Sequence, residues 1–240
     1  MLNKEERELL IKTYEKTHDA RLTAEIFSVH RSRVYAIVKQ YKETGSVEVR
    51  TSQCGRKRNE WVTNIDAYNP DTLVFLDESG VNIDMTRRYG RAVGKARAVD
   101  KTPENTPTNT TILSSVRLNG DTAYTTYSGG TTGDVFVDYL ENILIPTLHK
   151  GDIVIMDNLR SHHVKKVAEV LEKADVKLLY LPPYSPDLNP IEKMWSKIKS
   201  ILRKLKARTI QALPDAIDTA FSAVAPSDCI GWFKSCFVSC

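Results

Sequence analysis

The sequence predicts an α/β domain preceded by a small all-α module, and three observations support this. Segment 1–45 holds three short stretches with apolar residues at helical spacing. From about residue 71, short apolar runs alternate with helical patterns, as in an α/β sheet. Between them lies a polar, basic segment without clear periodicity. We therefore expect a helix-turn-helix module over 1–45, a basic arm or linker over 46–70 and an α/β domain over 71–240.

The composition is that of an ordinary soluble protein. Of the 240 residues, 41% are hydrophobic and 27% are charged, which excludes fibrous and wholly disordered classes. No run approaches the 18 apolar residues of a membrane span. The start MLNKEERELL is charged where an export signal would be apolar, and the four cysteines form no CxxC pair or disulfide framework. We expect a cytoplasmic protein.

The N-terminal segment predicts helices over 3–18, 22–28 and 31–43. Asn3 can cap the first helix and Gly45 can end the third. The tight connection before the third helix indicates a helix-turn-helix. Arg31, Ser32 and Arg33 would then lie in the first turn of the reading helix, where such helices contact base edges. A three-helix packing unit without a partner would show the same pattern.

Basic residues are concentrated in two segments. Within 28–58 there are eight Lys and Arg against two acids, and within 190–208 seven against one. Such concentration favours a polyanion, nucleic acid first, although solvated helix faces or a plain tether explain it equally. The candidate phosphate contacts are Arg56, Lys57 and Arg58 in the arm and Lys193 and Lys197 in the later helix.

The C-terminal part alternates strands and helices. Asn119-Gly120 lies between two β-rich runs and predicts a hairpin. The loop PPYSPDLNP (182–190) is rigid because most of its residues are proline or precede one. We expect strands over 73–77, 111–118, 122–128, 152–157 and 176–181, and helices over 134–149, 161–174, 190–206, 209–224 and 226–237.

Three acids stand out by position. Asp77 and Asp157 each close a predicted buried strand, and Glu192 lies in the first turn of the helix after the proline loop. Carboxylates at strand ends of an α/β sheet meet at one edge. Hard oxygen ligands suit Mg²⁺ or Mn²⁺, and two such ions about 3.5–4 Å apart can clamp an in-line phosphodiester displacement. The acids therefore predict a two-metal site.

Each acid also has a simpler explanation. Asp favours turns and could merely end a strand. Glu192 fits a capping box with Asn189 as N-cap and Pro190 as first helical residue. Glu78 is a competing ligand, although strand alternation directs it away from Asp77.

Neighbouring side chains suggest supporting roles. Asn158 and His162 follow Asp157 and could orient its carboxylate or contact a phosphate. A helix N-terminal loop capped by Ser161 explains them as well. Trp195 lies on the apolar face of the predicted helix 190–206, and we expect it in the core.

Four segments of the C-terminal part form a recognisable set: LVFLDESGVN (73–82), MTRRYGRA (85–92), VIMDNLRSHH (154–163) and LPPYSPDLNPIEKMWSKIK (181–199). Asp157 and Glu192 within them are separated by 34 residues. Together the segments resemble a known family, the bacterial insertion-sequence-630 transposases of the Tc–mariner superfamily, which shows this interval between its last two acids. The resemblance covers about 71–237.

The resemblance implies a ribonuclease-H-like mixed sheet flanked by helices, with Asp77, Asp157 and Glu192 as an acidic triad holding two Mg²⁺ or Mn²⁺ ions. It implies cleavage at element ends and strand transfer into target DNA at TA. The expected partners are double-stranded DNA, as terminal inverted repeats and target, and a second copy in a homodimer. No membrane is expected, and the location would be the bacterial cytoplasm, at the nucleoid.

The resemblance also leaves alternatives. Relatives carry two helix-turn-helix modules before the core, and one is readable here. The chain could therefore be a catalytically idle or truncated transposase-derived DNA-binding protein, acting like a repressor. An unrelated two-metal nuclease on the same core is a third reading.

Overall fold

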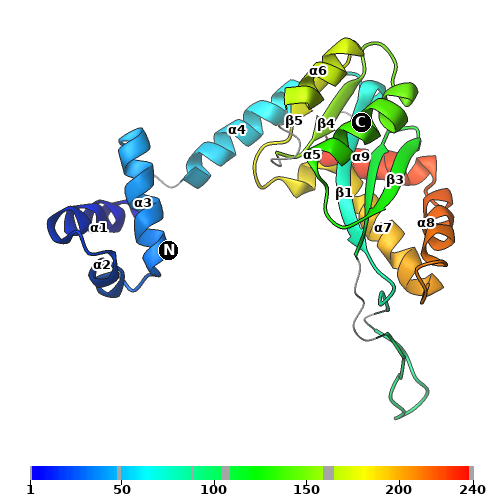
Figure 1. Cartoon of the computed structure of the whole chain (residues 1–240), viewed down its shortest axis with the longest axis horizontal. Helices are drawn as coiled ribbons and strands as arrows, with labels where there is room; N and C mark the ends of the chain where they lie inside the picture. Colours follow the sequence, from blue (N-terminus) through cyan, green and yellow to red (C-terminus); the bar gives the residue numbers. More distant parts are fainter. Residues whose placement is uncertain (1, 48–49, 88, 104–108, 159–164, 238–240) are drawn as a thin grey trace. The chain divides into compact units, whose positions relative to one another are not determined.

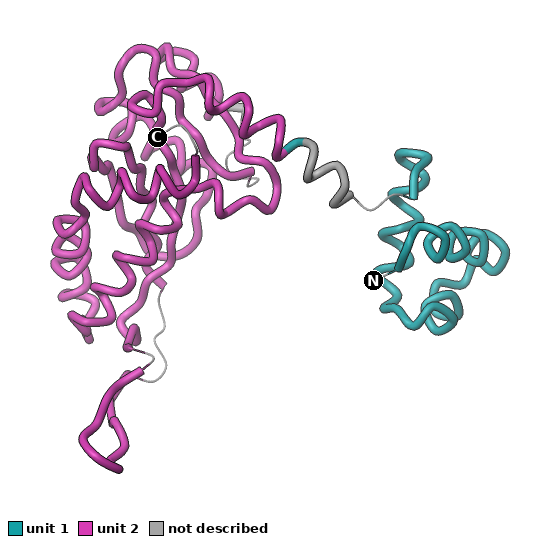
Figure 2. Tube along the Cα trace, turned by 180° about the vertical axis from the view of Figure 1, so that it is seen from behind, with its two compact units in different colours: residues 1–57 teal, residues 58–240 magenta. Residues whose placement is uncertain are grey.

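A computed structural model describes residues 2–47, 50–87, 89–103, 109–158 and 165–237, without the side chains of 50–56. The chain divides into two compact units, Met1–Lys57 and Arg58–Cys240 (Figure 2). The division falls inside the segment 46–70 that the sequence assigns to a linker. Each unit is described by itself.

The N-terminal unit contains three helices around one small core (Figure 1). They are α1 (Lys4–Thr17), α2 (Ala20–Ile26) and α3 (Arg31–Thr44). Asn3 caps α1 in a capping box with Glu6, and Gly45 ends α3 with a φ of 67°. Helix α2 begins earlier than predicted because Asp19 accepts hydrogen bonds from the first free backbone N–H groups.

Helix α4 (Arg50–Ile65) replaces the irregular linker expected over 46–60. The packing of its last turns explains why this segment is helical. Trp61 and Val62 pack against the core of the C-terminal unit, and Ile65 is buried within that core. The large apolar residues of the helix lie at this end, so residues 50–60 show no periodicity although their backbone is helical.

A mixed five-stranded sheet forms the centre of the C-terminal unit, in the order β3-β2-β1-β4-β5 (Figure 1). Strand β1 pairs antiparallel with β2 and parallel with β4, and β5 continues the parallel half. The predicted hairpin at Asn119-Gly120 is confirmed as β2–β3. The strands are β1 (Leu73–Val81), β2 (Thr110–Val116), β3 (Thr122–Ser128), β4 (Ile153–Met156) and β5 (Lys177–Tyr180).

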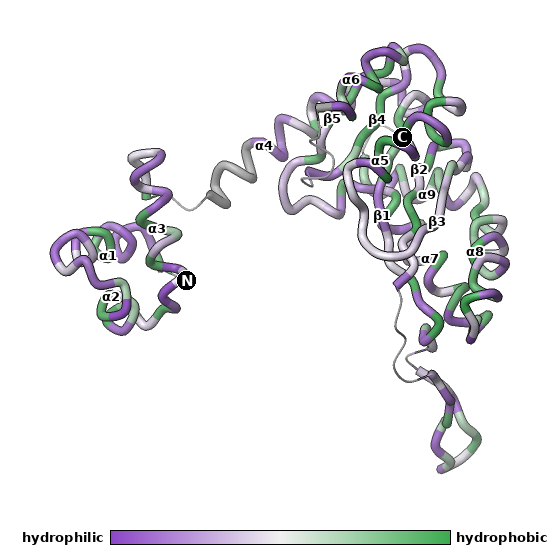
Figure 3. The backbone as a smooth tube through the Cα atoms, in the orientation of Figure 1, coloured by the Kyte–Doolittle hydropathy of each residue, from purple (hydrophilic) through white to green (hydrophobic). Residues whose placement is uncertain are grey.

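Helices cover both faces of this sheet. Alternation along β1 sends Leu73 and Phe75 to one face, and Val74 and Leu76 to the other. The first face carries α7 (Pro190–Leu205), α8 (Leu213–Ser222) and α9 (Pro226–Cys236), and the second carries α5 (Gly133–Tyr139) and α6 (Lys165–Lys173). Hydrophobic and hydrophilic stretches alternate along α8, as expected of a helix with one buried side (Figure 3).

The predicted fold class is confirmed, with two local differences. The helix expected over 134–149 ends at Tyr139 and continues as a π-helical turn (Leu140–Leu144) and a 3₁₀ turn (Ile145–Thr147) that contains Pro146. A long irregular connection joins β1 to β2. Its described residues are held at the base by Arg208, which donates to the carbonyls of Ile83 and Met85 at 2.9 Å.

Within the described residues, no helix is both long and apolar enough to cross a membrane.

Candidate catalytic site

The edge of the sheet where β4 ends brings the first two acids together. Leu76 and Met156 form the last parallel pair between β1 and β4, and Asp77 and Asp157 are the next residues on the two strands. Asp77 does not close its strand, contrary to expectation, because β1 continues to Val81 by pairing with β2 alone. Asp77 therefore lies within a strand, at the point where that strand loses its parallel neighbour.

Helix α7 supplies the third acid. Pro190 opens the helix, and the buried residues Ile191, Met194 and Ile198 hold it against the sheet. Glu192 is exposed on its first turn. The capping-box alternative for Glu192 is wrong, because the Asn189 side chain makes no capping hydrogen bond within the described part of the chain.

Two cavities adjoin these acids. One, of about 460 Å³, is bordered by the proline loop from Leu181 to Pro186 and by Asn189. The other, of about 640 Å³, is bordered by Glu78–Gly80 of β1 and by Gly130 and Thr131 in the loop between β3 and α5. Among the described residues, three line both cavities: Asp77, Asp157 and Glu192. The acids chosen from the sequence are thus the side chains that the two cavities share.

Burial and mutual repulsion mark Asp77 as the most perturbed of the three. Burial raises the pKa of Asp77 to about 7, and the charges of Glu192, Glu78 and Asp157 add to the rise. A hydrogen bond with the backbone of Glu78 opposes it. The Trp195 indole Nε1–H also donates to Asp77 Oδ2, at 3.1 Å. Among the described residues, the hydrogen-bond donors to Asp77 are therefore neutral groups, and its neighbours in the cavity include several acids.

The competing acid Glu78 lines the larger cavity together with Asp77, and its charge also acts on the other face of the sheet. Burial raises the pKa of Tyr139, and the charge of Glu78 adds to the rise. Tyr139 belongs to the core on the face of the sheet opposite α7. Of the supporting residues, Asn158 is exposed and lines the smaller cavity. His162 lies outside the described residues, so its predicted role stays a prediction.

Sequence reasoning missed two residues at the larger cavity, Trp195 and Lys199. They follow Glu192 at intervals of three and seven residues, which places all three on one face of α7. Helical spacing from Glu192 is the signal that could have identified them. Lys199 is the cationic residue on the described part of this cavity's lining.

The predicted phosphate contacts of α7 lie on a different surface. Lys193 and Lys197 line a groove with Lys204 and Trp232, apart from the acids. Lys197 forms an ion pair with Asp228, and Lys193 donates to the Ser235 hydroxyl. Both side chains are therefore tied to α9.

The arm residues also have defined surroundings. Arg58 forms a bidentate ion pair with Asp187 of the proline loop. This ion pair holds the pKa of the Asp187 carboxyl below its usual range. Lys57 is exposed. The side chain of Arg56 lies outside the described residues.

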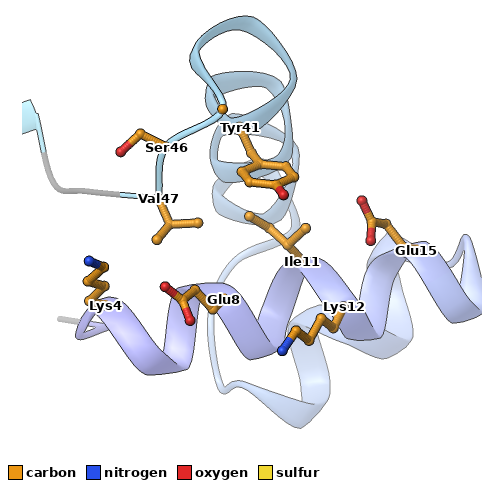
Figure 4. Close-up of a pocket in the computed structure, with 9 residues that line it drawn as sticks. Lys4, Glu8, Ile11, Lys12, Glu15, Tyr41, Ser46 and Val47 are labelled. Carbon is orange, nitrogen blue, oxygen red and sulfur yellow. The ribbon is translucent and has the colours of Figure 1, made fainter.

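In the N-terminal unit, Arg31, Ser32 and Arg33 are exposed on the first turn of α3, as predicted for a reading helix. This unit has a separate cavity of about 450 Å³ between α1 and the end of α3 (Figure 4). Its charged lining is Lys4, Glu8, Lys12 and Glu15, two of each sign. Such a balanced lining does not select a polyanion.

A mixed sheet covered by helices on both faces, with Asp77 and Asp157 directly after the last parallel pair of two adjacent strands, defines a protein of the ribonuclease-H-like class. Residues 72–214 match the family described as DDE superfamily endonuclease. The match spans more than half of the chain, and the chain belongs to this family.

Curated relatives are transposases of nematodes. The chain is 31% identical over 97 residues to the Tcb2 transposase of Caenorhabditis briggsae, across 39% of this chain and 36% of that protein. It is 27% identical over 94 residues to the Tc1 transposase of Caenorhabditis elegans, across 39% and 34%. The chain thus spans about a third of the length of the curated relatives it matches.

Solved structures of the Mos1 transposase share the fold. The Mos1 paired-end complex with left transposon end matches with a TM-score of 0.65 at 17% identity, over 98% of this chain and 76% of that chain. The Mos1 strand transfer complex gives 0.62 at 17%, over 98% and 76%. The Mos1 paired-end complex with Mg gives 0.62 at 16%, over 98% and 75%.

Proposed function

We propose that the chain is a DNA transposase of the insertion-sequence-630 type, which cuts DNA at the ends of its element and joins those ends to target DNA. One observation carries the proposal. Asp77, Asp157 and Glu192 come from three separate elements, and they are the residues shared by two adjoining cavities. Membership of the DDE superfamily endonuclease family supports the same chemistry.

The acids suit divalent metal ions by their chemistry. Carboxylate oxygens are the donors that Mg²⁺ and Mn²⁺ prefer. Among the described residues, no three Asp, Glu, His or Cys side chains are gathered closely enough to cage one ion. Mg²⁺ sites commonly use one or two carboxylates and complete the shell with water and substrate phosphate. The open arrangement of Asp77, Asp157 and Glu192 is compatible with a site of that kind.

The proposed roles follow from position. Asp77 and Asp157 would together bind the two ions, and Glu192 would complete the coordination of the second ion. When bound, such ions activate the attacking hydroxyl and stabilise the leaving oxygen. Lys199 would contact a phosphate beside the acids, and Asn158 would contact DNA from the side of the smaller cavity.

The N-terminal helices would recognise the terminal repeats. The module 1–45 would bind through Arg31, Ser32 and Arg33, with the basic residues of 46–70 following the backbone and 71–240 acting as the catalytic domain. The Mos1 transposase has been solved as a paired-end complex with left transposon end. By analogy this chain would act as a homodimer, and exposed Tyr89, Val93 and Val99 in the connection after β1 offer apolar contacts for it.

Nicking of end-containing DNA tests the proposal. The substrate is a duplex carrying the DNA that flanks the coding region, incubated with the full chain and Mg²⁺ or Mn²⁺. We expect nicking and, with a TA-containing target, strand joining. Asp77→Asn, Asp157→Asn or Glu192→Gln should lower the nicking rate at least about a hundredfold, because each removes a ligand from the metal site.

Binding must be measured in parallel. The three variants should keep their affinity for the same duplex, and Glu172→Gln, an exposed acid of α6, should nick like the wild type. Binding without nicking by the wild-type chain would favour the idle, repressor-like alternative. Nicking without joining would favour an unrelated nuclease. Wild-type nicking by Asp77→Asn would exclude the assigned site.

A further inference from the structure

Trp195 is a core residue that also makes a hydrogen bond to one of the candidate catalytic acids. It is buried, with 3% of its surface exposed, as the sequence predicted. Its indole Nε1–H nevertheless points at an acid and donates to Asp77 Oδ2 at 3.1 Å. Trp195 and Asp77 are 118 positions apart in the chain, on α7 and β1, so this contact exists only in the folded unit.

The indole ring is held in place by a series of aromatic contacts. Trp195 meets Phe221 of α8 edge-on, with ring centroids 6.3 Å apart and planes at 87°. Phe221 in turn stacks on Tyr124 of β3 at 3.8 Å. The Tyr124 hydroxyl donates to Asp218 of α8 at 2.6 Å, which closes the series. The direction of the indole N–H is therefore set by packing of two helices and a strand.

A neutral donor has a specific consequence for a carboxylate. Asp152 and Asp187 are each paired with an arginine, so their charges are largely cancelled. Asp77 is fixed by an indole N–H and a backbone hydrogen bond, which orient the carboxylate and leave its negative charge available. Partners of this kind orient ligands in metal sites.

We propose that Trp195 is a positioning residue of the acidic site: its indole N–H holds Oδ2 of Asp77 so that the carboxylate is oriented for a divalent cation. This rests on the proposed function, because it assumes that Asp77 is a metal ligand. It assigns Trp195 no contact with DNA or with the ion. Removing the N–H should weaken metal binding while the aromatic packing remains.

The chain offers a matched control. Trp61 packs against the same hydrophobic core, and its Nε1 has no hydrogen-bond partner among the described residues. Trp61→Phe therefore deletes an indole N–H that bonds to none of the described residues, whereas Trp195→Phe deletes the one that donates to Asp77. Loss of ring area is the same in both substitutions.

Direct Mn²⁺ binding to the full chain is the test, measured without DNA from the electron paramagnetic resonance signal of free Mn²⁺. We expect Trp195→Phe to raise the Kd for Mn²⁺ about tenfold, the usual scale for a partner of a metal ligand. Trp61→Phe should stay within about twofold of the wild type. Melting temperatures in chelator check that each variant is folded, and Trp195→Phe should lose more stability because Trp195 is buried whereas Trp61 is partly buried. Unchanged Mn²⁺ affinity in a folded Trp195→Phe variant would overturn the proposal.

A second measurement covers the case in which Trp195→Phe does not fold. The double variant Trp61→Phe, Trp232→Phe leaves Trp195 as the sole tryptophan. Saturating Mg²⁺ should change its fluorescence emission, and Asp77→Asn in this background should abolish the change. Constant emission during Mg²⁺ binding would contradict the proposal. If the wild type binds no Mn²⁺, or Asp77→Asn binds it normally, the proposed function itself fails.

Discussion

The carboxylates of this protein differ in their hydrogen-bonding partners. Acids paired with an arginine have a structural role, whereas the candidate catalytic acid Asp77 has neutral partners. Asp152 is buried beside Arg117, and Asp187 is paired with Arg58. Asp77 has neutral donors and three acidic neighbours instead, and its pKa is raised to about 7. A site that must bind cations needs carboxylates that are not already paired with a basic side chain, and Asp77 has no such partner among the described residues.

The raised pKa of Asp77 predicts an unusual pH dependence of stability. Between its unfolded pKa of 3.8 and about 7, the folded chain keeps a proton that the unfolded chain releases. The free energy of unfolding contributed by this group is therefore highest below pH 3.8 and is lost as the pH rises to 7. In chelator at pH 8, Asp77→Asn should be more stable than the wild type, on the order of 2 kcal/mol.

Urea unfolding at pH 5 and pH 8 in chelator measures this effect. The gain of Asp77→Asn over the wild type should be larger at pH 8 than at pH 5. Glu172→Gln, which changes an exposed acid of α6, should show no such difference. An equal effect of Asp77→Asn at both pH values would show that Asp77 is ionised throughout this range.

At the scale of elements, the two ends of strand β4 carry acids with different surroundings. Asp157 follows its last residue, at the acidic cavities. Asp152 precedes its first residue and is buried with Arg117, which follows the end of β2. Arg117 also donates to the Thr147 carbonyl, and Asp152 accepts from the backbone N–H of His149. The ion pair thus joins β2, β4 and the turn that precedes β4.

Breaking this buried pair should destabilise the fold without altering metal binding. Asp152→Ala leaves the Arg117 guanidinium buried and unpaired, and should cost about 3–5 kcal/mol in the free energy of unfolding. The double variant Arg117→Met, Asp152→Ala should recover part of that loss, because no buried charge remains.

Chemical denaturation measures the loss, and Mn²⁺ binding serves as the second readout. The exposed pair Lys150–Asp175 provides the control, and Lys150→Met should leave stability unchanged within error. A weaker Mn²⁺ affinity in the folded Arg117→Met, Asp152→Ala chain would mean that the two ends of β4 are not independent.

At the scale of the whole molecule, two units divide the proposed tasks. Residues 1–57 carry the exposed arginines of α3, and residues 58–240 carry the acids. Lys193, Lys197 and Arg58 have partners within the second unit. Sequence-dependent binding is therefore expected to depend chiefly on the first unit.

DNA binding by the full chain tests this division. Arg31→Ala with Arg33→Ala should weaken binding to end-containing duplex and should lower the salt slope of log K by about 2, because two cationic contacts are lost. The control is Lys150→Ala with Lys173→Ala, which removes the same charge from an exposed surface of the second unit. Equal effects of the two double variants would indicate that only net charge matters.

Local sequence patterns determined much of this protein. The turn residues Asn119-Gly120 specified the β2–β3 hairpin, and Asn3 and Gly45 marked helix ends. These features depend on residues close together in the chain, so they are readable without the fold. The choice of Asp77, Asp157 and Glu192 also came from the sequence, although their role as metal ligands stays a prediction.

Tertiary structure decided the features that depend on distant partners. Helix α4 forms where the sequence suggested a linker, because Trp61 and Ile65 find a core built from later segments. Strand β1 runs past Asp77 because β2 pairs with it there. Trp195 could be assigned to the core from its spacing alone, but the direction of its N–H follows from packing against Phe221. Periodicity specifies which face of an element is buried, whereas a hydrogen bond across 118 positions is determined only when the elements are packed together.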